Sequence, residues 1–467
     1  MMQTRSPGQL MVGSLMVCVM FAMLGARISN LDIFNTVANT CAIALLISCW
    51  RLTGLREIYL ISVSIGLSVV AKFSFHLPLS KFVAAINQAT FLIGFLLLLS
   101  ILHGAAKLSP AIAECGKFLT KQPPTRRYFA VYSGTNIMSV LFNLGIVSLL
   151  TPLIKKGSEQ SSKSDSKLNE NKQLSAMLRG FAWGVVWSPT ALAPLALFEL
   201  IEGINREAWI LYGVICAVCM CFVGWVDERW SKQQNKYTTP TQYHSTNPPL
   251  KAMFNFFMIL TLLLVMTVFI AQYFKETFVF GFLVACPIFT FFWLWVQSKT
   301  TDQSPRTAFK SLRDICLFEL PKSAKIIVAL ASSGYIGKLS AELVPGEYLV
   351  NQLGLMYLPD FIVLIFLSVV MVPFSWLGVS PIMMSVFFGT LLGNLPNLPV
   401  DPTLAALAIS CGWALSMTTS PFATVALMTA TLSNRTPLEL TLGSNIRFTL
   451  MCMMCLCLLF YLFTAGT

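Results

Sequence analysis

Thirteen long apolar stretches, separated by polar segments, occupy most of the sequence. They lie near 10–28, 32–50, 57–76, 82–103, 128–154, 175–203, 208–226, 251–274, 276–297, 318–338, 361–391, 403–432 and 440–465. Most are close to the ~20 residues that an α-helix needs to cross a bilayer. The pattern predicts an all-α polytopic membrane protein with about 11 transmembrane helices, the two remaining stretches being hairpins.

Three polar stretches interrupt the apolar pattern, at 155–175, 227–251 and 298–314. Their content of Ser, Lys, Asn, Pro and Gln is typical of solvated loops, so we expect loops and not soluble domains there. The sequence has no nucleotide-binding P-loop motif, so transport driven by ATP would require a second chain.

The composition excludes other classes of protein. Of the 467 residues, 56% are hydrophobic and only 11% are charged, about half the charged share of a soluble protein. A soluble enzyme, a disordered chain and a coiled coil are therefore excluded. The net charge of +12 comes from bases between the apolar stretches. This pattern indicates cytoplasmic loops of a membrane protein and no nucleic-acid partner.

The basic residues also predict the topology. With a cytoplasmic N-terminus, the two lysine-rich segments that flank Tyr128–Ile154 both fall inside only if that stretch enters and leaves on one side. We therefore expect a re-entrant hairpin at 128–154, with its tip near Phe142–Gly145. The same reasoning predicts a second hairpin at 361–391 that enters from outside. Such non-helical backbone is tolerated where it is buried in protein or lines a cavity.

Two segments of the chain align without gaps. The run from Gly180 to Pro189 matches the run from Gly412 to Pro421, with Gly, Ala, Ser and Pro at the same places. This indicates an inverted-topology repeat, the plan of many secondary transporters; chance similarity between apolar sequences is the alternative. The predicted organisation is an N-terminal helix (1–30), a first repeat (31–226), a cytoplasmic linker (227–250) and a second repeat (251–467).

Each Ser-Pro pair lies within an apolar run, at 175–203 and at 403–432. Proline lacks a backbone N–H and clashes with the preceding turn, so each helix should break there. A broken helix exposes the partial charges of its half-helix ends near the middle of the membrane. Each break, together with a hairpin tip, would form half of a binding site. A simple kink is the alternative.

This arrangement resembles the ion transporter superfamily, in its divalent-anion/sodium symporter and citrate-transporter-like branches. That family carries Ser-Asn-Thr at its hairpin tips, with a proline nine residues after the Asn. Here the first tip keeps Asn143 and Pro152, whereas Ser375-Trp376-Leu377 replaces the second motif. The resemblance implies an elevator-type secondary transporter, often dimeric. The changed tips put the family's two sodium sites and its dicarboxylate specificity in doubt.

Candidate binding residues follow from the tips and breaks. Hydroxyl and amide groups there suit hydrogen bonding to a carboxylate, and Trp faces suit stacking on a ring or cation. The predicted solute-binding residues are Asn143, Gly145, Ser188, Pro189, Thr190, Trp376, Gly378, Thr419, Ser420 and Pro421. Glu199, the acid nearest the first break in sequence, is the candidate for proton coupling, which we expect in place of sodium. Arg179 is a further intramembrane charge.

Catalytic and metal chemistry have little support. The sequence holds only three histidines, and both Cys-x-x-Cys pairs, Cys216 with Cys219 and Cys452 with Cys455, lie inside apolar runs. We interpret these cysteines as small packing residues, with zinc or redox roles as the alternative, and expect no cofactor, no metal and no enzyme activity.

The predicted function is secondary active transport of a small organic, anionic solute in the bacterial inner membrane. An exporter of a drug-like compound and a passive channel are the alternatives. Partners would be the solute, the coupling ion, membrane lipid and a second copy of the chain in a homodimer. The sequence leaves open the solute, the direction of transport and whether residues 1–28 are a cleaved signal peptide.

Overall fold

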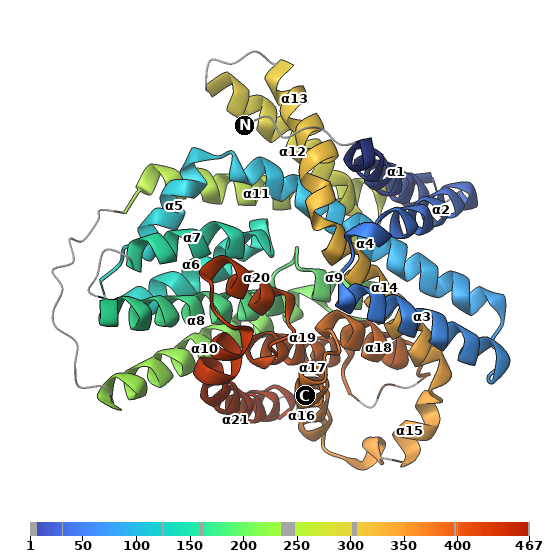
Figure 1. The fold of residues 1–467 in the computed structure, drawn as a ribbon. Coiled ribbons are helices and arrows are strands. Elements are labelled where there is room, and N and C mark those ends of the chain that lie inside the picture. The colour runs from blue at the N-terminus through green and yellow to red at the C-terminus, as the bar shows by residue number, and fades with distance from the viewer. Residues whose placement is uncertain are drawn as a thin grey trace. The chain divides into compact units, whose positions relative to one another are not determined.

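The computed structural model describes residues 7–29, 31–123, 126–158, 163–234, 248–300, 306–352, 354–396, 398 and 400–465. All the regular elements among these residues are helices (Figure 1). Eight of the described helices are long and apolar enough to cross a membrane. The other three of the 11 predicted spans form α2 (Asp32–Ser48), α3 (Leu55–Phe73) and α14 (Ala324–Leu343), which are outside this group. The chain is an all-α polytopic membrane protein.

The chain forms two compact units, and each takes segments from both halves of the sequence. The first unit contains residues 1–109 and 256–344, and the second contains residues 110–255 and 345–467. The chain therefore passes between the units three times.

The first unit is built around the long helix α4 (Leu79–Lys107). Its other helices are α1 (Pro7–Ser29), α2, α3, most of α11 (Leu250–Phe274), α12 (Phe278–Thr300), α13 (Arg306–Asp314) and α14. Helices α1, α12 and α14 pack against α4. The apolar middle of α4 is buried between them, which explains why this helix is apolar on all sides. Polar contacts of this unit include the ion pair between Lys81 and Glu342 at 2.6 Å.

The second unit contains both hairpins and both broken helices. Its first part has α5 (Pro110–Thr120), α6 (Arg127–Phe142), α7 (Gly145–Ser158), α8 (Lys163–Trp187), α9 (Leu192–Leu200) and α10 (Arg206–Gln234). Its second part has α15 (Gly346–Gln352), α16 (Asp360–Val369), α17 (Met371–Trp376), α18 (Pro381–Gly393), α19 (Pro402–Thr419), α20 (Thr424–Ser433) and α21 (Ser444–Thr464). Each part runs hairpin, broken helix, last helix.

The two parts of this unit pack in a matching way. The first arm of each hairpin lies on the broken helix of its own part, α6 on α8 and α16 with α17 on α19. The second arm of each hairpin packs on the broken helix of the other part: α7 packs on α20, and α18 packs on α9. The two long half-helices α8 and α19 also contact each other, as do α10 and α21. Figure 1 shows α6, α7 and α8 side by side in teal and green. Each of these contacts has its counterpart in the other part, which is consistent with two repeats related by a pseudo-two-fold axis.

The three polar stretches are less loop-like than expected. Helix α10 continues to Gln234, α8 begins already at Lys163, and 306–314 form the short helix α13. The expected linker 227–250 therefore begins with eight helical residues, and its segment 235–247 lies outside the described residues, as do 159–162 and 301–305. Lys, Glu, Gln and Arg are good helix formers, so polar sequence extends the apolar helices and does not end them.

Candidate functional site

The first hairpin turns at Asn143 and Leu144, between α6 and α7. Asn143 has φ +47° and ψ −134°, and asparagine tolerates positive φ better than most residues. Its side-chain Oδ1 accepts a hydrogen bond from the Leu144 N–H at 2.8 Å. The amide that the sequence analysis selected is thus used locally to hold the turn, and Gly145 begins the second arm.

The first half of the first broken helix, α8, ends at Trp187, and the second half, α9, begins at Leu192. The chain is non-helical over Ser188–Ala191, which we call the first break. The hydroxyls of Ser188 and Thr190 lie 3.1 Å apart. Thr190 Oγ1 also donates a hydrogen bond to the carbonyl oxygen of Val140 on α6. The break is therefore bonded directly to the first hairpin arm, one turn before the hairpin tip.

The second part repeats this contact. Helix α17 ends at Trp376, and Gly378, with φ +87°, makes the turn into α18. The second break covers Ser420–Ala423, between α19 and α20. Ser420 Oγ donates a hydrogen bond to the Ser375 carbonyl oxygen at 2.6 Å. In both parts a hydroxyl of the break holds a carbonyl of the first hairpin arm.

The predicted hydroxyl ligands are thus buried, and two of them, Thr190 and Ser420, link a break to a hairpin arm. Ser188, Thr190, Thr419 and Ser420 are each only 1% exposed, and Thr419 Oγ1 donates to the Leu415 carbonyl within its own helix at 2.9 Å. What the second tip and break expose is apolar: Trp376 (43%), Leu377 (80%) and Phe422 (47%). Pro189, Pro421 and Gly378 are partly exposed.

Asn136 is a polar residue of this region that the sequence analysis missed. It lies on α6, two turns before the tip, and is 7% exposed. Its Oδ1 accepts a hydrogen bond from Trp187 Nε1 at 2.7 Å, and its Nδ2 donates to the Gly180 carbonyl at 3.1 Å. One amide thus joins the hairpin arm to the last turns of α8. An amide in an apolar stretch was the available signal, because buried polar groups in membranes need partners.

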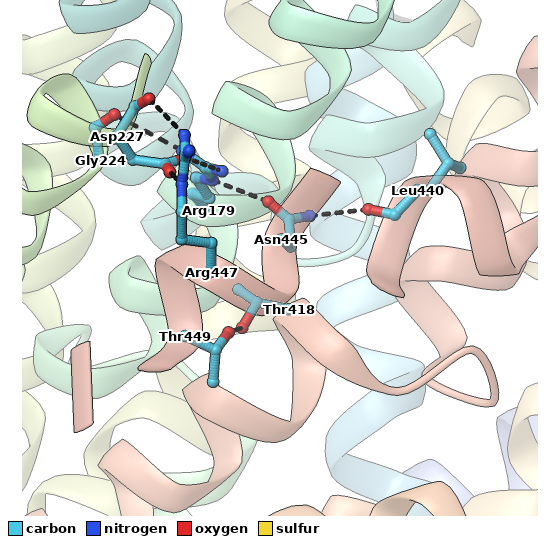
Figure 2. Close-up of polar contacts among 8 residues, drawn as sticks. All are labelled: Arg179, Gly224, Asp227, Thr418, Leu440, Asn445, Arg447 and Thr449. Carbon is cyan, nitrogen blue, oxygen red and sulfur yellow. Dashed lines mark hydrogen bonds and ion pairs between the residues drawn. The ribbon is translucent and has the colours of Figure 1, made fainter. Parts of the chain in front are cut away.

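A charged cluster (Figure 2) forms around Arg179, which lies on α8 about two turns before the first break. Arg179 Nη2 is 2.8 Å from Asp227 Oδ2 on α10, and Arg179 Nε donates to Asn445 Oδ1 on α21 at 2.7 Å. Arg447 also binds Asp227, through Nε to the carboxylate and through Nη2 to the carbonyl oxygen at 2.9 Å. The Arg179 guanidinium stacks on the Phe448 ring at 4.2 Å.

The charged cluster accounts for the intramembrane charge that the sequence analysis noted. Arg179, Asp227 and Asn445 are 3%, 4% and 0% exposed. A buried charge is tolerated when it is paired and hydrogen-bonded. Here Arg179 on α8 is bonded to Asp227 on α10 and to Asn445 on α21. The cluster therefore holds α8, α10 and α21 together as one body.

The fold does not place Glu199 at the first break. It lies in the last turn of α9, partly exposed, and close enough to Arg206 for their charges to interact. Eight helical residues place it roughly 10 Å from the start of α9. Among the described residues of this unit, the buried acids are instead Asp227 and Glu170, and each is paired with an arginine.

The cysteines form no disulfide; all 13 are free thiols. Among the described residues no group of three or more His, Cys, Asp or Glu side chains could hold a metal ion. The two Cys-x-x-Cys pairs lie within the membrane-spanning helices α10 and α21.

Comparison with known proteins identifies a similar fold. The structure is similar to the crystal structure of the YdaH transporter of Alcanivorax borkumensis, with a TM-score of 0.54 over 79% of this chain and 84% of that chain. The two sequences are 12% identical, so the likeness shows the fold alone. No protein-family model matches the sequence, and no curated protein matches it.

Proposed function

We propose that this protein is a secondary active transporter of a small organic, anionic solute, and that the solute binds in the second compact unit between the hairpin tips and the helix breaks. The observation that carries the proposal is the repeated bond between a break and a hairpin arm, Thr190 to Val140 and Ser420 to Ser375. The fold shared with a transporter supports the same function.

An anionic solute is favoured by the direction of the half-helices. Helices α7, α9, α18 and α20 all begin at a tip or a break. The N-terminus of a helix carries about half a positive charge and unpaired N–H groups, which attract anions. A carboxylate placed there would receive backbone hydrogen bonds, and the buried hydroxyls would hold the geometry.

The exposed Trp376, Leu377 and Phe422 favour a second candidate, an exporter of a drug-like compound. Three large apolar side chains at one tip and break match a solute with an apolar or aromatic part. Both candidates use the same unit and differ in direction and substrate.

The mechanism we propose is of the elevator type. Both hairpins and both breaks belong to one compact unit, and the charged cluster and the second hairpin arms tie its helices together. Such a unit can carry a bound solute across the membrane as a rigid body. We further propose that the protein is located in the bacterial inner membrane, and that it forms a homodimer, as the resemblance implies.

For the coupling ion we propose a proton in place of sodium. Sodium is bound by several oxygens, commonly unwound backbone carbonyls and hydroxyls. Here the Val140 and Ser375 carbonyls each already accept a hydrogen bond, from Thr190 and Ser420, which leaves each carbonyl oxygen one lone pair fewer for an ion. Glu199 remains the candidate proton acceptor of this proposal.

The proposal is tested with purified protein in liposomes. Uptake and release of a library of aromatic and aliphatic carboxylates would be measured under an imposed pH or sodium gradient. We expect transport that follows the pH gradient. Uptake driven by sodium at fixed pH, without a response to a pH gradient, would overturn proton coupling, and no transport of any solute under either gradient would overturn the function.

Replacing Asn143 with alanine should lower transport about tenfold, because a hydrogen bond worth about 1–3 kcal/mol is lost at the first tip. Asn434→Ala is the matched control: Asn434 also has positive φ, +56°, but ends α20 far along the chain from its break. Equal losses in both variants would assign the effect to backbone strain and remove Asn143 from the site.

The proposed topology is tested by labelling single cysteines in a cysteine-depleted background. Lys156→Cys lies at the end of α7 and Glu202→Cys just after α9, and both positions are exposed. With a cytoplasmic N-terminus and a re-entrant hairpin, an impermeant reagent added to intact cells should label residue 202 and not residue 156. Labelling of residue 156 from outside would exclude the hairpin topology.

A further inference from the structure

A groove of about 400 Å³ lies between α6 and α10 of the second unit. At one end the Phe129 and Phe222 rings meet edge to face, 6.1 Å apart. At the other end Trp187 closes it, next to Asn136. The groove wall also includes Tyr132, whose hydroxyl donates to the Ala217 carbonyl across the two helices at 2.9 Å.

The mouth of the groove opens on the outer surface of α10. Val214, Val218 and Phe222 line it and are 37%, 50% and 55% exposed. They follow each other at four-residue intervals, so they share one face of the helix. The opposite rim carries Ser133, which is also exposed.

The position of the mouth determines what can enter it. The membrane-spanning part of α10 runs from Arg206 to Trp230, and Val218 is its middle residue. Twelve residues of helix on either side correspond to about 18 Å, whereas half of the hydrocarbon core is about 15 Å. The mouth is therefore at the depth of the acyl chains and not at that of the head groups.

We propose that this groove binds an acyl chain of a bilayer phospholipid, and that the bound chain packs against Trp187 at the first break. Its volume lies within the range of small-molecule sites, and its lining is mainly apolar, with an aromatic residue at each end. Through the Trp187–Asn136 hydrogen bond of 2.7 Å, an occupied groove supports the contact between the first hairpin arm and α8. The proposal does not depend on the transport function.

The test uses the full-length protein in phosphatidylcholine nanodiscs that contain a small fraction of phosphatidylcholine with a photoreactive diazirine in one acyl chain. Adducts are mapped by peptide mass spectrometry. We expect peptides covering 129–137 and 214–222 to be labelled about fivefold more than the exposed face of α11, where Phe254, Val265 and Phe269 are 58–69% exposed and serve as ordinary lipid contacts.

Val218→Trp places an indole in the mouth and should reduce labelling of 129–137 about fivefold. Leu211→Trp is the matched control, because Leu211 is exposed (59%) on the same helix but does not line the groove; it should leave the labelling unchanged. Ser133→Leu, which fills the groove from α6, is used if Val218→Trp fails to fold. Labelling equal to that of α11, or insensitive to both filling variants, would show ordinary bilayer contact and overturn the proposal.

Discussion

Asp227→Ala is expected to destabilise the protein by about 3–5 kcal/mol, because it leaves the Arg179 guanidinium buried without its carboxylate. Arg179 is 3% exposed, and its contacts with the Gly224 carbonyl at 3.5 Å and with Asn445 at 2.7 Å are to neutral groups, which do not replace the carboxylate. The measurement is the unfolding midpoint of the detergent-purified variant, followed by the fraction that stays monodisperse after heating.

Two variants separate the buried pair from general loss of charge. Arg447→Ala removes the second arginine on Asp227, but the Arg447 side chain is 42% exposed, so the expected cost is at most about 1 kcal/mol. The double variant Arg179→Met with Asp227→Leu replaces the buried ions by apolar groups and should recover most of the stability. A double variant no more stable than Asp227→Ala would show that the pair is not the cause.

The partners of Arg179 could not be predicted from the sequence. Its position in an apolar stretch identified an unusual charge, but Asp227 and Asn445 lie 48 and 266 residues away along the chain. The polar residues that follow Asp227 predict the end of the helix, and so place Asp227 in a loop. The ion pair forms because α10 continues into that polar sequence, to Gln234.

The breaks were more predictable than their chemistry. Proline removes a backbone donor, and α8 and α19 do end at Trp187 and Thr419, directly before the two Ser-Pro pairs. The same serines and threonines were expected to face a solute, yet Thr190 and Ser420 face hairpin carbonyls. The direction of a short polar side chain depends on which helix packs beside it, and a single sequence does not contain that information.

The equivalence of Gly180 and Gly412 does have a physical reason in the structure. A Cβ on Gly180 would meet the Tyr132 carbonyl oxygen of α6, and one on Gly412 would lie 2.7 Å from the Ser368 carbonyl oxygen of α16. In both parts the first hairpin arm also donates a side-chain hydrogen bond to the broken helix, Asn136 to Gly180 and Ser368 to Ala408 at 2.8 Å. Glycine is therefore required where each arm approaches its broken helix backbone to backbone.

Gly180→Ala and Gly412→Ala are accordingly each expected to destabilise the second unit by about 1–3 kcal/mol, because the added methyl group overpacks a backbone contact that cannot move aside. Gly66→Ala is the matched control: Gly66 lies within α3 with nothing within 4 Å of the added Cβ, and alanine there should stabilise the helix by about 0.5–1 kcal/mol. The measurement is the unfolding midpoint of the three purified variants. Because the two contacts are related by the repeat, similar losses are expected at both glycines, and a loss at one with a gain at the other would contradict the equivalence of the two parts.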